Sequence, residues 1–211
     1  MLLQGNQNQT GKQFGQNITL GMGEFSEALV SELQPRYYEQ VYRGQTFYTS
    51  VAAAAPTAYI GAAGGTPLIG LWNPAGTGKN LVLLRASVAL ATQATTTLNT
   101  TSIRLYGGQT AAITQGTVSV PVSLLSLTAT GSIAKSYLNV ALTASTALTY
   151  IESIGSYWWS TAVGTALVPP VTWDFSGSII VIPGNMIALG SYAALTAATY
   201  DAALTWVEVP I

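Results

Sequence analysis

The glycine-rich stretch "NPAGTGKN", residues 73–80, is the first segment whose residue types suggest chemistry. A P-loop uses glycines to expose backbone N–H groups to phosphates, and a hydroxyl after its Gly-Lys to hold Mg²⁺. Asn73 occupies the position of the motif's first glycine, and Asn80 the position of its hydroxyl residue. In "NLVLLRASVAL", which follows, every second residue is apolar, and this predicts a strand where a phosphate site needs a helix. We therefore predict a turn at residues 73–80.

Carboxylates are the other groups with catalytic potential, because the chain contains neither histidine nor cysteine. Those absences exclude the commonest general base, the Cys nucleophiles and the usual zinc ligands. A glycosidase needs only two carboxylates, about 5 to 9.5 Å apart. The acids that follow residue 39 are Glu152, Asp174, Asp201 and Glu208.

Asp174 is the strongest catalytic candidate, because aromatic rings stack on sugars and its neighbours are Trp173 and Phe175. An aspartate in such a segment more commonly forms an Asx turn, and no second acid is paired with it in the sequence. The chain also lacks the D-x-[DN]-x-[DN]-G loop of a typical calcium site. We predict no catalytic residue, no metal and no cofactor.

The composition is unusually poor in charge. Charged residues make up 7% of the 211 residues and the net charge is -1, whereas about 25% is usual. Direct nucleic-acid binding needs clustered Lys and Arg and is not expected. With 49% hydrophobic residues, the surface is predicted to be covered by other subunits. The alternative is a surface kept wet by Ser and Thr hydroxyls.

Neither a membrane helix nor an export signal is expected. No run of 18 or more apolar residues lacks polar interruption. The segment "MLLQGNQNQTGK" has neither the basic region nor the apolar core of a signal peptide. We therefore predict no membrane partner.

Residues 1–45 are predicted to form an extended N-terminal arm, and residues 46–211 a folded domain. "QGNQNQTGKQFGQN" has almost nothing to bury, so it needs a partner surface in order to become ordered. Ser26–Leu33 fits a short helix that ends before Pro35, or an extended segment.

The rest of the chain reads as β-structure. Runs such as "PLIGLWN", "NLVLLRASVALAT", "TTSIRLYGG" and "NMIALGSYAAL" alternate with Gly, Pro, Asn and Ser breaks. Eight or more short strands without convincing helices predict an all-β fold, an antiparallel β-sandwich or jelly roll. "STALTYIESIGSYWW", residues 145–159, is the exception and suggests a short helix in a long connection.

The C-terminal segment "SGSIIVIPGNMIALGSYAALTAATYDAALTWVEVPI" resembles jelly-roll structural proteins of tailed-phage virions, such as decoration, head-fibre and tail-tip proteins. The matching residues are Ile182, Pro183, Gly184, Ile187, Leu189, Trp206 and Glu208. "LWNPAGTGKNLVLLRASVAL" is similar to the hairpin after the first core strand in such proteins. The resemblance covers a little over a quarter of the chain. It implies a homotrimer or a capsomer-bound subunit without enzymatic activity.

Ten residues are candidates for interaction, because aromatic rings gain from burial between subunits and charges can form ion pairs there. They are Arg36, Tyr37, Tyr38, Tyr42, Arg43, Tyr157, Trp158, Trp159, Asp174 and Glu208. Glu208 lies between Val207 and Val209, so it is predicted to face solvent or a neighbouring subunit. Arg85 and Arg104 lie within strand patterns and are candidate partners for Glu208 or Asp174.

Together these features predict a non-enzymatic virion protein, assembled in the host cytoplasm. The leading hypothesis is a capsid decoration protein that oligomerises, as a trimer, and clamps onto other capsid proteins through residues 1–45. One alternative is a receptor- or glycan-binding fibre or tail-tip module that grips saccharide with Trp158 and Trp159. The other is the major shell-forming protein itself.

Overall fold

The computed structural model describes eleven segments of the chain. They are residues 4–6, 17–19, 37–55, 65–92, 99–110, 112–113, 117–129, 131–142, 147–159, 169–192 and 198–211. Within them, the side chains of residues 4–6, 17–19, 99–101 and 157–159 are outside the description.

The chain divides into two compact units, Met1–Tyr38 and Glu39–Ile211. In the first unit, strands β1 (Gln4–Asn6) and β2 (Asn17–Thr19) form an antiparallel pair. Most of the predicted arm, including Arg36 and the alternative helix at Ser26–Leu33, lies outside the described residues.

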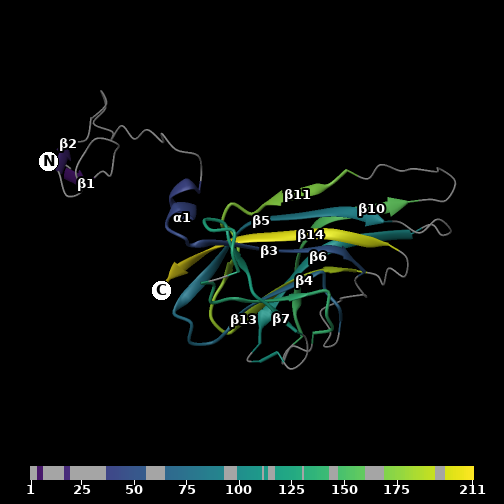
Figure 1. Ribbon diagram of the computed structural model, residues 1–211. Helices are drawn as coiled ribbons and strands as arrows, with labels where there is room; N and C mark the ends of the chain where they lie inside the picture. Colours follow the sequence, from purple (N-terminus) through teal and green to yellow (C-terminus); the bar gives the residue numbers. More distant parts are fainter. Residues whose placement is uncertain are drawn as a thin grey trace. The chain divides into compact units, whose positions relative to one another are not determined.

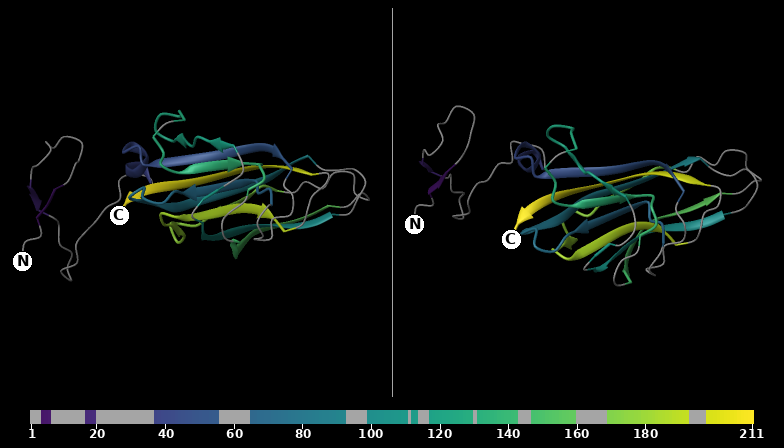
Figure 2. Two further views of the ribbon diagram at one scale, coloured as in Figure 1. Left: turned by 90° about the horizontal axis from the view of Figure 1, so that it is seen from below. Right: turned by 60° about the horizontal axis from the view of Figure 1, so that its bottom comes forward.

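The second unit contains two antiparallel sheets, stacked as two layers (Figures 1 and 2). One has the order β10-β6-β13-β4-β9-β7, and the other the order β11-β5-β14-β3-β8, with β12 also paired to β5. The strands are β3 (Thr46–Ala54), β4 (Ile69–Asn73), β5 (Lys79–Thr92), β6 (Asn99–Gln109), β7 (Val118–Ser119), β8 (Val122–Ser123), β9 (Lys135–Leu138), β10 (Thr149–Trp159), β11 (Val171–Asp174), β12 (Ile180–Val181), β13 (Asn185–Ser191) and β14 (Thr199–Pro210). The all-β sandwich expected from the sequence is confirmed.

The eight principal strands form nested pairs: the first strand along the chain pairs with the last, the second with the second last, and so on inward. β3 pairs with β14, β4 with β13, β5 with β11, and β6 with β10. The β14–β5 pairing joins the β3–β14 pair to the β5–β11 pair in one sheet. The β13–β6 pairing joins the β4–β13 pair to the β6–β10 pair in the other sheet. This order is that of a long hairpin wound into two sheets, which is a jelly roll. Short strands β7, β8 and β9 are an insertion between β6 and β10.

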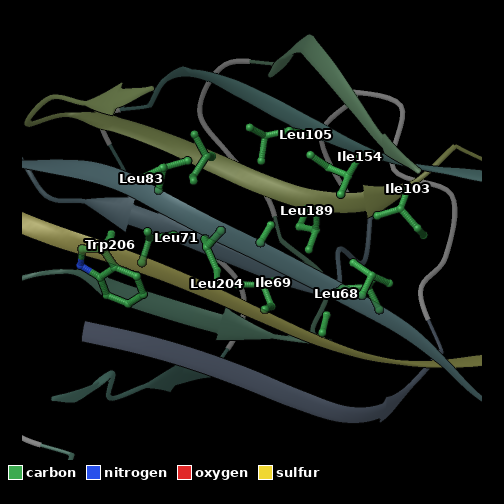
Figure 3. Packing of buried hydrophobic residues seen from close by; sticks show 14 of the residues in the cluster. Leu68, Ile69, Leu71, Leu83, Ile103, Leu105, Ile154, Leu189, Leu204 and Trp206 are labelled. Carbon is green, nitrogen blue, oxygen red and sulfur yellow. The ribbon is translucent and has the colours of Figure 1, made fainter. Parts of the chain in front are cut away.

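The main core lies between the two sheets, where strand alternation directs every second side chain inward. Figure 3 shows Leu71, Leu105 and Leu189 from one sheet facing Leu83, Leu204 and Trp206 from the other. Trp206 is fully buried and stacks on Phe47, with ring centroids 6.4 Å apart. Thr49 adds a polar link between the layers by donating a hydrogen bond to Ser136 Oγ, at 3.3 Å.

A second apolar cluster covers the outer face of the β6–β13–β4 sheet. Its buried members are Tyr106, Tyr137, Leu142, Leu148, Met186 and Ala188. Gly70 allows this packing, because a Cβ there would meet Leu142 at 2.5 Å and Met186 at 2.7 Å. This sheet is therefore buried on both faces in part of its area.

One helix, α1 (Tyr38–Tyr42), precedes the first long strand. Gly44 follows it with φ of 67°. The Gln45 N–H donates to Gln40 O and the Gly44 N–H to Val41 O, the pattern of a glycine-ended helix. The first long strand therefore begins at Thr46.

Two sequence expectations are wrong. Residues 149–159 form strand β10 rather than a helix, and two register shifts in its pairing with β6 disrupt the period-two pattern. The stretch 73–80 does not close a hairpin, because β4 and β5 belong to different sheets. It is instead a corner between the layers, as a jelly roll requires.

The Pro183-Gly184 segment forms a tight turn. Asn185 N–H donates to Ile182 O at 3.1 Å, and Gly184 has φ of 83°. Proline at the second position and a positive φ at the third define a type II turn. This turn leads from β12 into β13.

Replacing Trp206 with alanine tests the core. We expect Trp206→Ala to lower the free energy of unfolding by about 3–5 kcal/mol, because it leaves a cavity between the sheets. Urea unfolding followed by far-UV circular dichroism measures this. Trp173→Ala is the matched control, because Trp173 is 36% exposed, and should cost less than half as much. Equal losses for the two variants would contradict the assigned core.

Candidate functional site

The stretch 73–80 is a hydrogen-bonded corner. Asn73 Nδ2 donates to Lys79 O at 2.8 Å and to Val181 O at 2.9 Å, and Thr77 Oγ1 donates to Asn73 Oδ1 at 2.7 Å. Gly76 and Gly78 have φ of 79° and 66°, which glycine adopts without strain. The predicted turn is confirmed, and strand β5 follows it directly.

The prediction for Glu208 is wrong. Its side chain faces the interior of the sandwich rather than solvent or another subunit. Its side chain is fully buried, and its carboxylate accepts hydrogen bonds from Lys79 Nζ at 3.1 Å, Ser132 Oγ at 2.7 Å and Ile133 N at 3.0 Å. Strand alternation explains the error: Glu208 shares the inward face with Leu204 and Trp206. Its partners come from distant parts of the chain.

The two aspartates also have structural partners. Asp174 Oδ1 accepts from the Ser176 N–H at 2.7 Å and from Ser176 Oγ at 3.1 Å, so the predicted Asx turn is confirmed, although it follows a strand. Asp201 Oδ1 accepts from the Ala53 N–H at 2.8 Å. Ala53 has φ of 49° and lies where the β14–β3 register shifts. Asp201 therefore holds a bulge in β3.

The predicted interaction residues whose side chains the structure describes do not form one site. Tyr38, Tyr42 and Arg43 are exposed on and after α1, where Arg43 pairs with Glu39 one turn away, and Tyr37 precedes the helix. The backbone of residues 157–159 (Tyr157, Trp158, Trp159) pairs with residues 99–101 of β6. Arg36 and the side chains of residues 157–159 are outside the description.

A cluster of aromatic side chains surrounds Arg104, on the outer face of β6. We call Arg104, Tyr106, Tyr150 and Tyr192 the Arg104 cluster. The guanidinium carbon of Arg104 lies 3.9 Å from the ring centroid of Tyr192 and 5.2 Å from that of Tyr150. Its Nε donates to Ser102 Oγ at 2.8 Å. The cation therefore lies within cation–π distance of two rings.

Tyr106 forms the buried floor of the Arg104 cluster. Its ring meets Tyr150 edge-on, with centroids 6.3 Å apart. Burial raises the pKa of the Tyr106 hydroxyl, and the positive charge of Arg104 partly opposes the rise. Burial likewise raises the pKa of Tyr137. Both phenols therefore stay neutral at physiological pH.

Sequence reasoning singled out Arg104 but missed Tyr150 and Tyr192. Three neighbouring strands bring these residues together: Tyr150 pairs with Tyr106 across β10 and β6, and Gly190, two residues before Tyr192, pairs with Arg104 across β13 and β6. A sequence signal existed only for Arg104, as a rare charge within a strand pattern. A second cation–π pair, Lys135 over Trp72 at 5.4 Å, lies on strands β9 and β4.

The other surface features offer less chemistry. An open hollow of about 350 Å³ on β3, β5 and β14 is lined by small side chains and by Asp201. The Asp201 carboxylate already accepts a hydrogen bond from the Ala53 N–H in the β3 bulge. The described residues contain no group of three acids placed to hold a metal ion. Among the described segments, no helix has the length and apolar character needed to cross a membrane.

We compared the chain with known protein families, curated proteins and solved structures. No known protein family, curated protein or solved structure matches the chain.

The buried carboxylate generates a stability prediction. Lys79→Met should lower the free energy of unfolding by about 3 kcal/mol, because it leaves the Glu208 charge buried without its cation. The lower end of the range for buried ion pairs applies, since the Lys79 side chain is 36% exposed. Adding Glu208→Gln to Lys79→Met should recover at least half of the loss, since an amide needs no counter-charge. Urea unfolding of the unchanged protein, the Lys79→Met and Glu208→Gln single variants and the double variant gives the coupling energy. A loss below about 1 kcal/mol for Lys79→Met would mean that the pair acts as a surface ion pair.

Proposed function

We propose that the protein is a non-enzymatic structural subunit of a virus particle, a decoration protein bound to a capsid shell. The observation that carries the proposal is a jelly-roll sandwich that exposes large apolar side chains in a chain with very little charge. Viral capsid domains and lectins are among the proteins built on jelly rolls. Fold alone does not assign a function, so the surface has to supply the argument.

Most of the exposed aliphatic side chains in the described part of the chain lie in two places. At one end of the β14-containing sheet, Ile180 of β12 pairs with Val82, which pairs in turn with Val207 of β14. Ile180 and Ile182 are about half exposed, and Ile211 is 78% exposed. The second place is the β7–β8 insertion, where the exposed residues are Val118, Val120, Leu125 and Leu127. Such surfaces favour protein–protein contact.

Three of the four acids after residue 39 have structural roles. Asp174 holds a turn, Asp201 holds a bulge, and Glu208 is sequestered in the interior. Each of these three carboxylates thus stabilises the sandwich itself. In the proposal, the sandwich forms a closed homo-oligomer, a trimer by the resemblance to phage decoration proteins, and residues 1–45 attach it to the shell.

The mass of the protein in solution tests this function. Light scattering should find the same closed oligomer for the full chain and for a chain that lacks residues 1–35, because the sandwich supplies the contacts. The truncated protein should then be missing from purified particles, as measured by mass spectrometry. If both chains are monomers, the proposal is wrong. If the full chain builds shells and the truncated one is a monomer, the protein is the shell-forming subunit.

The apolar end of the sheet gives a second test of assembly. Ile180→Asp combined with Ile182→Asp should shift the oligomer towards monomer, because it places two charges in the subunit contact. Thr172→Asp, an exposed position on β11, is the matched control and should leave the mass unchanged. An unchanged mass for the double variant would exclude this end of the sheet from the contact.

A further inference from the structure

The Arg104 cluster has a feature that a subunit contact does not require: a cation that contacts two half-exposed rings. Arg104 lies on the outer face of β6, since Ile103 and Leu105 on either side are fully buried in the core. Tyr150 is 51% exposed and Tyr192 is 49% exposed. All three side chains therefore border solvent on the same face of one sheet.

The orientation of the guanidinium is set by its neighbours. Arg104 Nε donates a hydrogen bond to Ser102 Oγ at 2.8 Å, and the guanidinium carbon lies 3.9 Å from the centroid of the Tyr192 ring. Within the described part of the chain, no carboxylate lies within ion-pairing distance of Arg104. A preorganised guanidinium with terminal N–H groups matches a carboxylate, which accepts two parallel hydrogen bonds from such a fork.

The tyrosines add a second chemical preference. Each offers an apolar ring face and a hydroxyl, the combination that suits the C–H faces and hydroxyl groups of a pyranose ring. A nucleic acid would require several clustered cations, whereas Arg104 is a single cation in a chain of net charge -1. The chemistry thus combines recognition of one carboxylate with recognition of a sugar ring.

We propose that the Arg104 cluster binds an acidic saccharide, with Arg104 pairing with the sugar carboxylate and Tyr150 and Tyr192 contacting the ring. This binding activity goes beyond the proposed structural role and is independent of it. It would allow an assembled particle to adhere to uronate- or sialate-bearing surfaces. The site lies on β6, β10 and β13, away from the β12–β5–β14 end assigned to the subunit contact.

A glycan array with the full-length protein tests the ligand class. The probes are glucuronate- and sialate-terminated oligosaccharides, each beside its carboxyl-amidated analogue. We expect the acidic member of a pair to bind at least about tenfold more tightly, since amidation removes the charge-assisted pairing. No binding to any acidic probe, or equal binding of acid and amide, would overturn the proposal without affecting the oligomer mass.

Variants then locate the site, with calorimetry against the best acidic probe. Arg104→Met should lower the affinity by at least about tenfold, and Tyr192→Ala should also weaken it. Arg85→Met is the matched control, because Arg85 is an exposed arginine on the other sheet, and it should bind like the unchanged protein. Circular dichroism confirms that each variant is folded. If Arg104→Met retains full affinity, the saccharide does not bind at this cluster.

Discussion

Burial of the C-terminal strand β14 between β3 and β5 is the constraint on which the rest of the sandwich depends. β14 pairs with β5 along most of its length and with β3 on its other edge. It also contributes Leu204 and Trp206 to the core and Glu208 to the buried ion pair. The last strand of the chain thus completes the sheet that the first long strand began.

Scarcity of charge gives each ionisable side chain a large effect. In most proteins a surface ion pair contributes little, but here Lys79 reaches a carboxylate that is fully removed from water. The aspartates hold backbone features that apolar residues cannot stabilise, namely the turn after β11 and the bulge in β3. Three of the few carboxylates of this domain therefore stabilise local features of the fold.

The two sheets have different outer faces. One carries an added apolar layer, with Tyr106, Tyr137 and Met186, and next to it the Arg104 cluster. The other is built of small residues along β3, β5 and β14, and exposes aliphatic side chains at one end. In the proposed assembly, one sheet joins the neighbouring subunits and the other carries the proposed saccharide site. The jelly roll keeps the two surfaces apart because its core is rigid.

The sequence by itself determined the fold class, the turn at 73–80 and the Asx turn at Asp174. These are local features, since strand alternation and turn chemistry depend on neighbouring residues. It failed at β10, where bulges mask the alternation, and at Glu208, whose partners are remote in the chain. Only the tertiary structure decided that Arg104 meets Tyr150 and Tyr192. Strand pairing between distant segments made that juxtaposition, and no periodicity in a single strand encodes which strand will lie beside it.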